Sequence, residues 1–161
     1  MPKPLKRHTA LIPLSQDHHF GLLLVWKIRQ GLMKKVEIQR IVDYLDYFVT
    51  NHLESHFQIE EELLFSFLAK NDLMRKEAEE QHRSIRENYK KIIQLGVDVD
   101  QLSRFADELE AHIRFEERKL FQYMQVELLD EDFRKMSEKV YEVHRKVEEE
   151  WLDEFWGKSK V

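Results

Sequence analysis

Apolar residues recur at intervals of three and four along two long segments of the chain, residues 36–69 and residues 98–128. This spacing gathers them on one face of an α-helix, and such a face has to be buried against other helices. The chain has only four Gly and three Pro, too few for a protein built from many strands and tight turns. The pattern therefore predicts an all-α fold.

Predicted helices cover nearly the whole chain, at residues 15–30, 36–69, 73–95, 98–128 and 131–156. Ser15 is the expected N-cap of the first helix, and Asp98 or Asp100 that of the fourth. Gly31 and Gly96 are expected to end the first and third helices. Because short connections favour antiparallel neighbours, the first four helices predict an up-down-up-down four-helix bundle.

The remaining segments are expected to accompany this bundle as part of one domain. Residues 1–13 are interpreted as an irregular N-terminal leader and residues 14–128 as the bundle. Residues 129–161 are expected to form an additional C-terminal helix with an apolar seam of its own. That helix packs either on the bundle or on a second subunit, and in the second case it would form a homodimer.

Composition excludes several classes of function. The net charge of −5 provides no basic surface for nucleic acid. No apolar run approaches the roughly 18 residues of a membrane span, and the N-terminus lacks the apolar region of a signal peptide, so we expect a cytoplasmic protein without a membrane partner. Cys is absent, which excludes disulfides and thiolate ligands. A metal ion could therefore be held only through nitrogen and oxygen.

Polar residues interrupt the apolar faces of the two long helices in the same way. The stretch HFQIEEELLF at residues 56–65 resembles HIRFEERKLF at residues 112–121, with five of ten positions identical. Positions i and i+4 share a helix face, so His56 faces inward with Glu60, and His112 with Glu116. The Glu that follows each pair points away and is expected to face solvent or to support a ligand. One such pair is commonly a plain contact within a helix, but two with matching flanks indicate a shared site.

The other two bundle helices each offer one candidate partner, His18 and His82. Four imidazoles and two carboxylates in a bundle core suit a dinuclear metal site, in which the carboxylates bridge the ions. Imidazole and carboxylate ligands fit iron, manganese, zinc or copper. His19 is an alternative to His18. His52, one turn before His56, either orients a ligand or is an additional one.

The ordered set of Asp17-His18, HFQIEEELLF, EEQH and HIRFEERKLF resembles the hemerythrin-like, or HHE cation-binding, domains. The resemblance covers about residues 14–126. It implies a four-helix bundle around a bridged di-iron centre containing two iron ions, for which manganese or zinc could substitute. It further implies that the four His are terminal ligands and that the two Glu bridge the irons. The ligand residues would then be His18, His56, Glu60, His82, His112 and Glu116.

The chain differs from the oxygen-carrying members of this family in its expected His ligands. Those members have a second His one turn along the third helix, whereas this chain has Ala78 and Arg86 one turn either side of His82. The chain is more similar to the bacterial subset with four His and two Glu. That subset includes proteins of iron–sulfur cluster repair, but these commonly carry a Cys-bearing N-terminal segment.

Three functions are compatible with these features. The first is a non-haem di-iron protein that binds or senses O₂ or NO, or that handles iron. The second is a di-iron oxidoreductase or a repair protein for nitrosative or oxidative stress, which would require a redox partner as external electron donor. The third is a plain bundle whose His and Glu side chains only hydrogen-bond. We expect a metal-binding protein rather than an enzyme.

Overall fold

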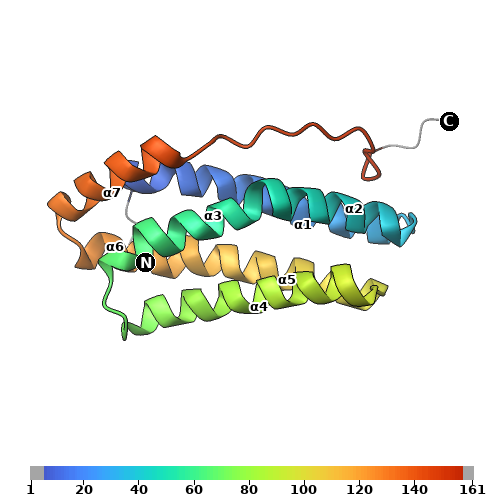
Figure 1. Ribbon diagram of the computed structural model, residues 1–161, viewed down its shortest axis with the longest axis horizontal. Coiled ribbons are helices and arrows are strands. Elements are labelled where there is room, and N and C mark those ends of the chain that lie inside the picture. The colour runs from blue at the N-terminus through green and yellow to red at the C-terminus, as the bar shows by residue number, and fades with distance from the viewer. Residues whose placement is uncertain (1–5, 158–161) are drawn as a thin grey trace.

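The computed structural model describes residues 6–157, and four long helices make up most of this part of the chain (Figure 1). The first and third are α1 (Ile12–Met33) and α4 (Leu73–Leu95). The second runs without a break through α2 (Ile38–Phe48), η2 (Val49–Leu53), α3 (Glu54–Ile59), η3 (Glu60–Leu64) and η4 (Phe65–Phe67). The fourth runs through α5 (Val99–Phe115), η5 (Glu116–Leu120) and α6 (Phe121–Glu127). A fifth helix, α7 (Asp130–Val143), follows, and η1 (Thr9–Leu11) precedes α1.

The long helices lie alongside one another as a four-helix bundle (Figure 1). Helix α1 contacts α2 and α5, and α4 contacts the same two helices from the other side. The part of the chain that the structure describes has no β-strand, so the predicted all-α fold is confirmed. Within that part, none of the helices combines the length and the apolar character needed to span a membrane.

The predicted ends of the third helix and the start of the fourth are confirmed. The side chain of Asp72 caps α4 by accepting from the backbone N–H groups of Met74 and Arg75. Helix α4 ends at Leu95, and Gly96 then adopts a φ of 79°, which favours glycine. Asp98 forms a reciprocal capping box with Gln101 at the start of α5.

The start and end of the first helix differ from the prediction. Helix α1 begins at Ile12, with Pro13 in its first turn, so Ser15 is not the N-cap. The helix also continues past Gly31 to Met33. Gly31 instead permits close packing, because a Cβ there would lie 2.8 Å from Ile41 Cδ1 and from Phe155 Cε2. Of the predicted leader, residues 9–11 form η1, and residues 1–5 lie outside the described part of the chain.

The predicted fifth helix is wrong beyond Val143. Helix α7 buries Phe133, Met136 and Val140 against the bundle of the same chain, next to η1 and η3. Residues 144–157, here called the C-terminal strap, have an irregular, largely extended backbone and run along the bundle towards its far end (Figure 1). Tertiary contacts override the helical periodicity of this segment. In the strap, Trp151 and Phe155 pack around Tyr44.

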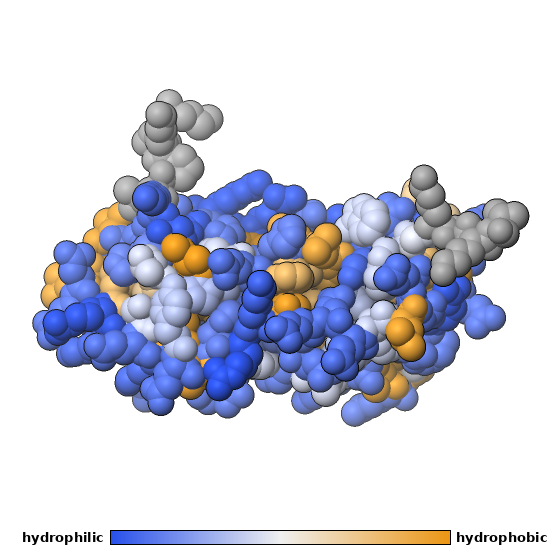
Figure 2. All heavy atoms as spheres, turned by 90° about the horizontal axis from the view of Figure 1, so that it is seen from above, coloured by the Kyte–Doolittle hydropathy of each residue, from blue (hydrophilic) through white to orange (hydrophobic). Residues whose placement is uncertain are grey.

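Ion pairs and backbone contacts hold the strap on α1 and α2. Arg40 pairs with Asp153, and the ammonium group of Lys27 lies 3.1 Å from a Glu149 carboxylate oxygen. The phenol group of Tyr47 accepts a hydrogen bond from the backbone N–H of Glu150. Residues 158–161, the end of the predicted helix, lie outside the described range. The face along which the strap runs is largely hydrophilic, with scattered apolar side chains (Figure 2).

The described part of the chain has three π-helical turns, η2, η3 and η5, and the last two alter the buried faces of the second and fourth helices next to the repeated motif. Each of these two begins at an inward-facing Glu of the repeated motif. A π-helical turn contains one more residue than an α-helical arrangement would need. Beyond η3 the buried positions are therefore Leu64 and Leu68, whereas an uninterrupted α-helical period from Glu60 would bury Leu63 and Phe67. Beyond η5, Met124 is buried in the same way in place of Tyr123.

The apolar core consists of two separate clusters. One surrounds Tyr44 and Phe105 near the ends of α2, α4 and α5, and the other surrounds Phe65 and Phe121 near α7. Between the clusters lies a layer of buried polar side chains from all four long helices. That layer contains the residues of the repeated motifs.

Candidate metal centre

All six predicted ligand residues converge in the polar layer. They are His18 of α1, His56 of α3, Glu60 of η3, His82 of α4, His112 of α5 and Glu116 of η5. Each is at most 5% exposed. Ionisable groups are this deeply buried only when they are paired with one another or bind a metal.

Their ligand atoms form two groups that share both carboxylates. His18 and His56 lie close to Glu60 and Glu116 in the first group, and His82 and His112 lie close to the same two carboxylates in the second. Within each group the candidate ligand atoms are within 4.8 Å of one another. Two overlapping groups with shared carboxylates are the geometry that a dinuclear centre needs.

The imidazole Nε2 atoms face the carboxylates of this layer. His56 Nε2 lies 3.0 Å from Glu60 Oε1, and His82 Nε2 lies 3.3 Å from the same oxygen. His82 Nε2 is also 3.4 Å from Glu116 Oε1, and His112 Nε2 contacts that oxygen directly. A bare imidazole nitrogen beside a carboxylate is unfavourable, so either protons or metal ions must lie between them.

The opposite ring nitrogen of every one of these His is already engaged. The Nδ1–acceptor distances are 2.8 Å for His18 to Glu117, 2.9 Å for His56 to Asp17, 2.7 Å for His82 to Glu61 and 2.7 Å for His112 to Gln81. Because a carboxylate only accepts, Nδ1 carries the hydrogen where its partner is Asp or Glu. The Nε2 lone pair is then free for a metal, an arrangement common at metal-bound His.

Buried atoms without a hydrogen-bond partner test whether the residues fit a metal. Among the described residues, these atoms include Nε2 of His18, His56 and His112, both carboxylate oxygens of Glu60 and Oε2 of Glu116. Leaving so many buried polar atoms unsatisfied would cost several kcal/mol in total. Metal coordination would satisfy these atoms, so the donor set fits metal binding.

Electrostatics in the metal-free layer point the same way. Burial disfavours a charge on His56, but the nearby Glu60 and Asp17 outweigh it and raise the pKa of His56 to about 10. The pKa of His82 is also raised despite burial, by Glu116, Glu60 and Glu61. Glu116 has a pKa well below its usual range, since His112 and its other neighbours overcome the cost of burial. Without a metal, the layer therefore attracts protons into the positions that cations would occupy.

The supporting carboxylates are held ionised. Burial opposes ionisation of Glu61, but hydrogen bonds from His82 and Arg86 lower its pKa to about 2. Burial also opposes ionisation of Glu117, whose pKa is lowered by His18 and further by Arg7. The prediction that these two Glu face solvent or support a ligand is resolved in favour of support.

Other His residues have different positions. His52 is absent from both ligand groups and packs against Tyr47 and Phe48. His19, the alternative to His18, is also absent from them and contacts Phe20. Nε2 of His144 lies 2.9 Å from both carboxylate oxygens of Asp17.

Sequence reasoning missed Asp17 and Gln81 as supporting residues. Each directly precedes a ligand His, on α1 and α4, and each contacts a His of the adjacent long helix. The repeated pattern of an acceptor before His was the available signal. Their partners on other helices could be found only from the three-dimensional structure.

Comparison with known proteins adds one match. The model of the hemerythrin HHE cation-binding domain matches residues 14–124, which include all six candidate ligands. Searches of curated proteins and of solved structures found no match. The buried His and Glu groups agree with the cation binding for which the family is described. The chain belongs to the hemerythrin HHE cation-binding domain family.

Proposed function

We propose that this chain is a non-haem di-iron protein that binds a small diatomic ligand, O₂ or NO. The observation that carries the proposal is the pair of overlapping ligand groups that share Glu60 and Glu116. A single-ion site would need only one group, and a plain hydrogen-bonded core would not leave so many buried Nε2 and carboxylate atoms without partners.

Each ion position would have a defined set of ligands. His18 and His56 would hold the first ion, and His82 and His112 the second, while Glu60 and Glu116 would join both. The two carboxylates offset part of the cationic charge that the apolar clusters above and below would otherwise disfavour. Imidazole and carboxylate also bind manganese and zinc, so the ligand types alone do not select iron. The identity of the metal as iron is a separate claim of the proposal.

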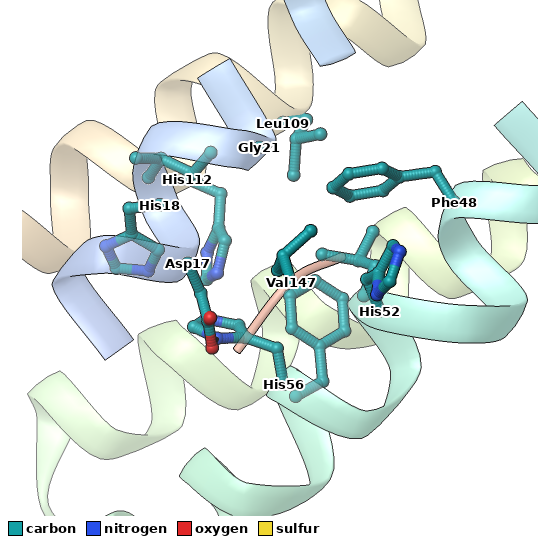
Figure 3. A pocket seen from close by; sticks show the side chains of 12 residues that line it. Asp17, His18, Gly21, Phe48, His52, His56, Leu109, His112 and Val147 are labelled. Carbon is teal, nitrogen blue, oxygen red and sulfur yellow. Dashed lines mark hydrogen bonds and ion pairs between the residues drawn. The ribbon is translucent and has the colours of Figure 1, made fainter. Parts of the chain in front are cut away.

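A small, mostly apolar cavity beside the first ion position supports binding of a diatomic ligand. Among the side chains that line it are His18, His56 and His112 on one side, with Phe48 and His52 on another (Figure 3). Val147 of the C-terminal strap also borders the cavity. Iron bound next to this space would supply a redox-active position for O₂ or NO. The apolar lining would keep water from competing for it.

The first test is the metal content of protein purified without chelators, measured by mass spectrometry together with the optical spectrum. We expect about two irons per chain and a spectrum that changes when O₂ or NO is added. Iron-loaded protein that responds to neither gas would refute the diatomic-ligand proposal. Repeated turnover with an added reductant would favour the oxidoreductase alternative.

A matched pair of substitutions tests the bridging role of Glu60. Glu60→Ala removes a buried carboxylate shared by both groups, so we expect a large loss of bound iron. Glu62→Ala is the control, because Glu62 is exposed and accepts a hydrogen bond from Gln58 on the same helix. An iron content unchanged by Glu60→Ala would remove Glu60 from the ligand set.

A further inference from the structure

The side chains that support the four imidazoles repeat from one half of the bundle to the other, with one exception. Glu117 supports His18, and Glu61, at the equivalent place in the other motif, supports His82. Asp17 supports His56, but the equivalent partner of His112 is the amide of Gln81. An acid in one half is thus matched by a neutral group in the other.

The charged groups around these supporting residues can be compared between the two halves. Arg7 lies 2.7 Å from Glu117, and Arg86 lies 2.6 Å from Glu61 while also pairing with Glu54 at 2.8 Å. Asp17 instead contacts His144, whose ring nitrogen lies 2.9 Å from it. With the His side chains counted as neutral and Glu54 included, the two sets of supporting groups carry the same net charge. The difference lies in the group that contacts Nδ1, which is the carboxylate of Asp17 in one half and the amide of Gln81 in the other.

A carboxylate acceptor on Nδ1 makes the imidazole a stronger donor at Nε2 than an amide acceptor does. It does so because a partial negative charge moves onto the ring as the Nδ1 hydrogen is drawn towards the carboxylate. His56 therefore donates more strongly than His112. The buried Asp17 carboxylate, at 12% side-chain exposure, also attracts a cation through the low-dielectric interior, whereas Glu54 is half exposed and paired with Arg86.

We infer that the two metal positions are unequal, and that Asp17 is the positioning residue that makes the His18–His56 position bind the first cation more tightly. This inference rests on the proposed metal centre. It assigns the tighter position to the pair of His residues that both line the apolar cavity, which His112 of the other position also borders. Replacing a supporting residue of this kind typically changes metal affinity about 10- to 100-fold.

His144 fixes the orientation that this role requires. The Asp17 carboxylate contacts both His56 and His144, so it cannot rotate away without losing one of them. His144 is the first residue of the C-terminal strap, which is itself held on α1 and α2. The strap thereby keeps the carboxylate directed at His56.

The experiment is an anaerobic calorimetric titration of the metal-free full-length chain with ferrous iron alone. We compare wild type with Asp17→Asn, Gln81→Glu and the double variant. Both substitutions preserve side-chain size, and the melting temperature of each metal-free variant checks that it folds. Asp43→Asn is the control, because it removes an equal charge from an exposed residue bonded only to Gln39 on its own helix.

The affinities of the first and second iron-binding steps should differ among the variants. In Asp17→Asn the ratio between the two affinities should fall about 10- to 100-fold relative to wild type, through weakening of the tighter step. Gln81→Glu should reduce the ratio by strengthening the weaker step, and the double variant should restore it. With one equivalent of ⁵⁷Fe, Mössbauer spectra of the wild type should show iron mainly in one of the two environments. Spectra of the double variant should show it mainly in the other.

Two results would overturn the inference while leaving the metal centre in place. One is an affinity ratio that Asp17→Asn changes no more than Asp43→Asn does. The other is an equal distribution of the first equivalent of ⁵⁷Fe over both environments in wild type. If no variant and no wild-type protein binds ferrous iron, the proposed function itself is refuted, and the inference with it.

Discussion

Metal loading of this protein should release protons, because imidazoles that must be neutral as ligands carry charge in the metal-free layer. The pKa of His56 is about 10 and that of His82 is raised as well, so both are protonated at pH 7 without metal. Their Nδ1 hydrogens are held by Asp17 and Glu61, so the proton that leaves is the one on Nε2. We expect about two protons per chain at pH 7.

The pH dependence of binding follows from this number. Each proton released makes the apparent affinity rise about tenfold per pH unit, so two protons give about a hundredfold rise between pH 6 and pH 7. Zinc is a suitable probe, because it has no redox chemistry of its own. Titrations in two buffers of different protonation enthalpy give the proton count directly, and His56→Ala should reduce it by about one.

Stability of the metal-free protein should show the opposite trend. A pKa raised from 6.5 to about 10 means that His56 contributes stability below pH 6.5 and that this contribution is lost as pH rises through about 10. The loaded protein lacks this dependence, since its imidazoles are neutral. The difference in melting temperature between loaded and metal-free protein should therefore widen from pH 7 to pH 10. Binding of two zinc ions with no proton release would refute the reasoning.

Three further predictions concern stability and are measured by thermal unfolding. Phe155→Ala removes a buried side chain of the C-terminal strap and should cost about 3 kcal/mol, or about 6–12 °C, whereas Leu152→Ala, at a fully exposed residue of the same strap, should have almost no effect. Gly31→Ala places a methyl group against Ile41 and should cost about 1–3 kcal/mol; an unchanged melting temperature would show that the helices separate easily. Glu61, with its pKa of about 2, contributes stability that is lost as pH falls from 4.5 towards 2, so Glu61→Gln should flatten that part of the acid unfolding profile.

The bundle and the convergence of its six polar residues were predictable because both depend on local spacing. A His and a Glu four residues apart share a face in any helix, and that face also carried the apolar residues. Helix ends marked by strong local sequence signals, such as Asp72 and Gly96, were equally predictable. These features depend on a few neighbouring residues and on the helical period alone.

Features that depend on distant contacts were not predictable. The strap has helical periodicity, yet its Trp151 and Phe155 pack on Tyr44 from an extended backbone. The π-helical turns shift the buried face by one residue, and the spacing of apolar residues in the sequence does not predict them. Asp17 gave no sign of its partners, because His56 and His144 lie 39 and 127 residues away in sequence.

The position of the polar layer between two apolar clusters has a consequence for how the molecule opens. Residues of one cluster have their buried neighbours mainly within that cluster, so each end of the bundle can loosen with limited effect on the other. Two ions that share Glu60 and Glu116 would fasten all four long helices at the middle of their length. Amide hydrogen exchange should then slow at both ends of the bundle when metal binds, because neither end could open without distorting the coordination of the shared ions. The metal centre would thus couple the two ends of the bundle, so that they unfold as one cooperative unit.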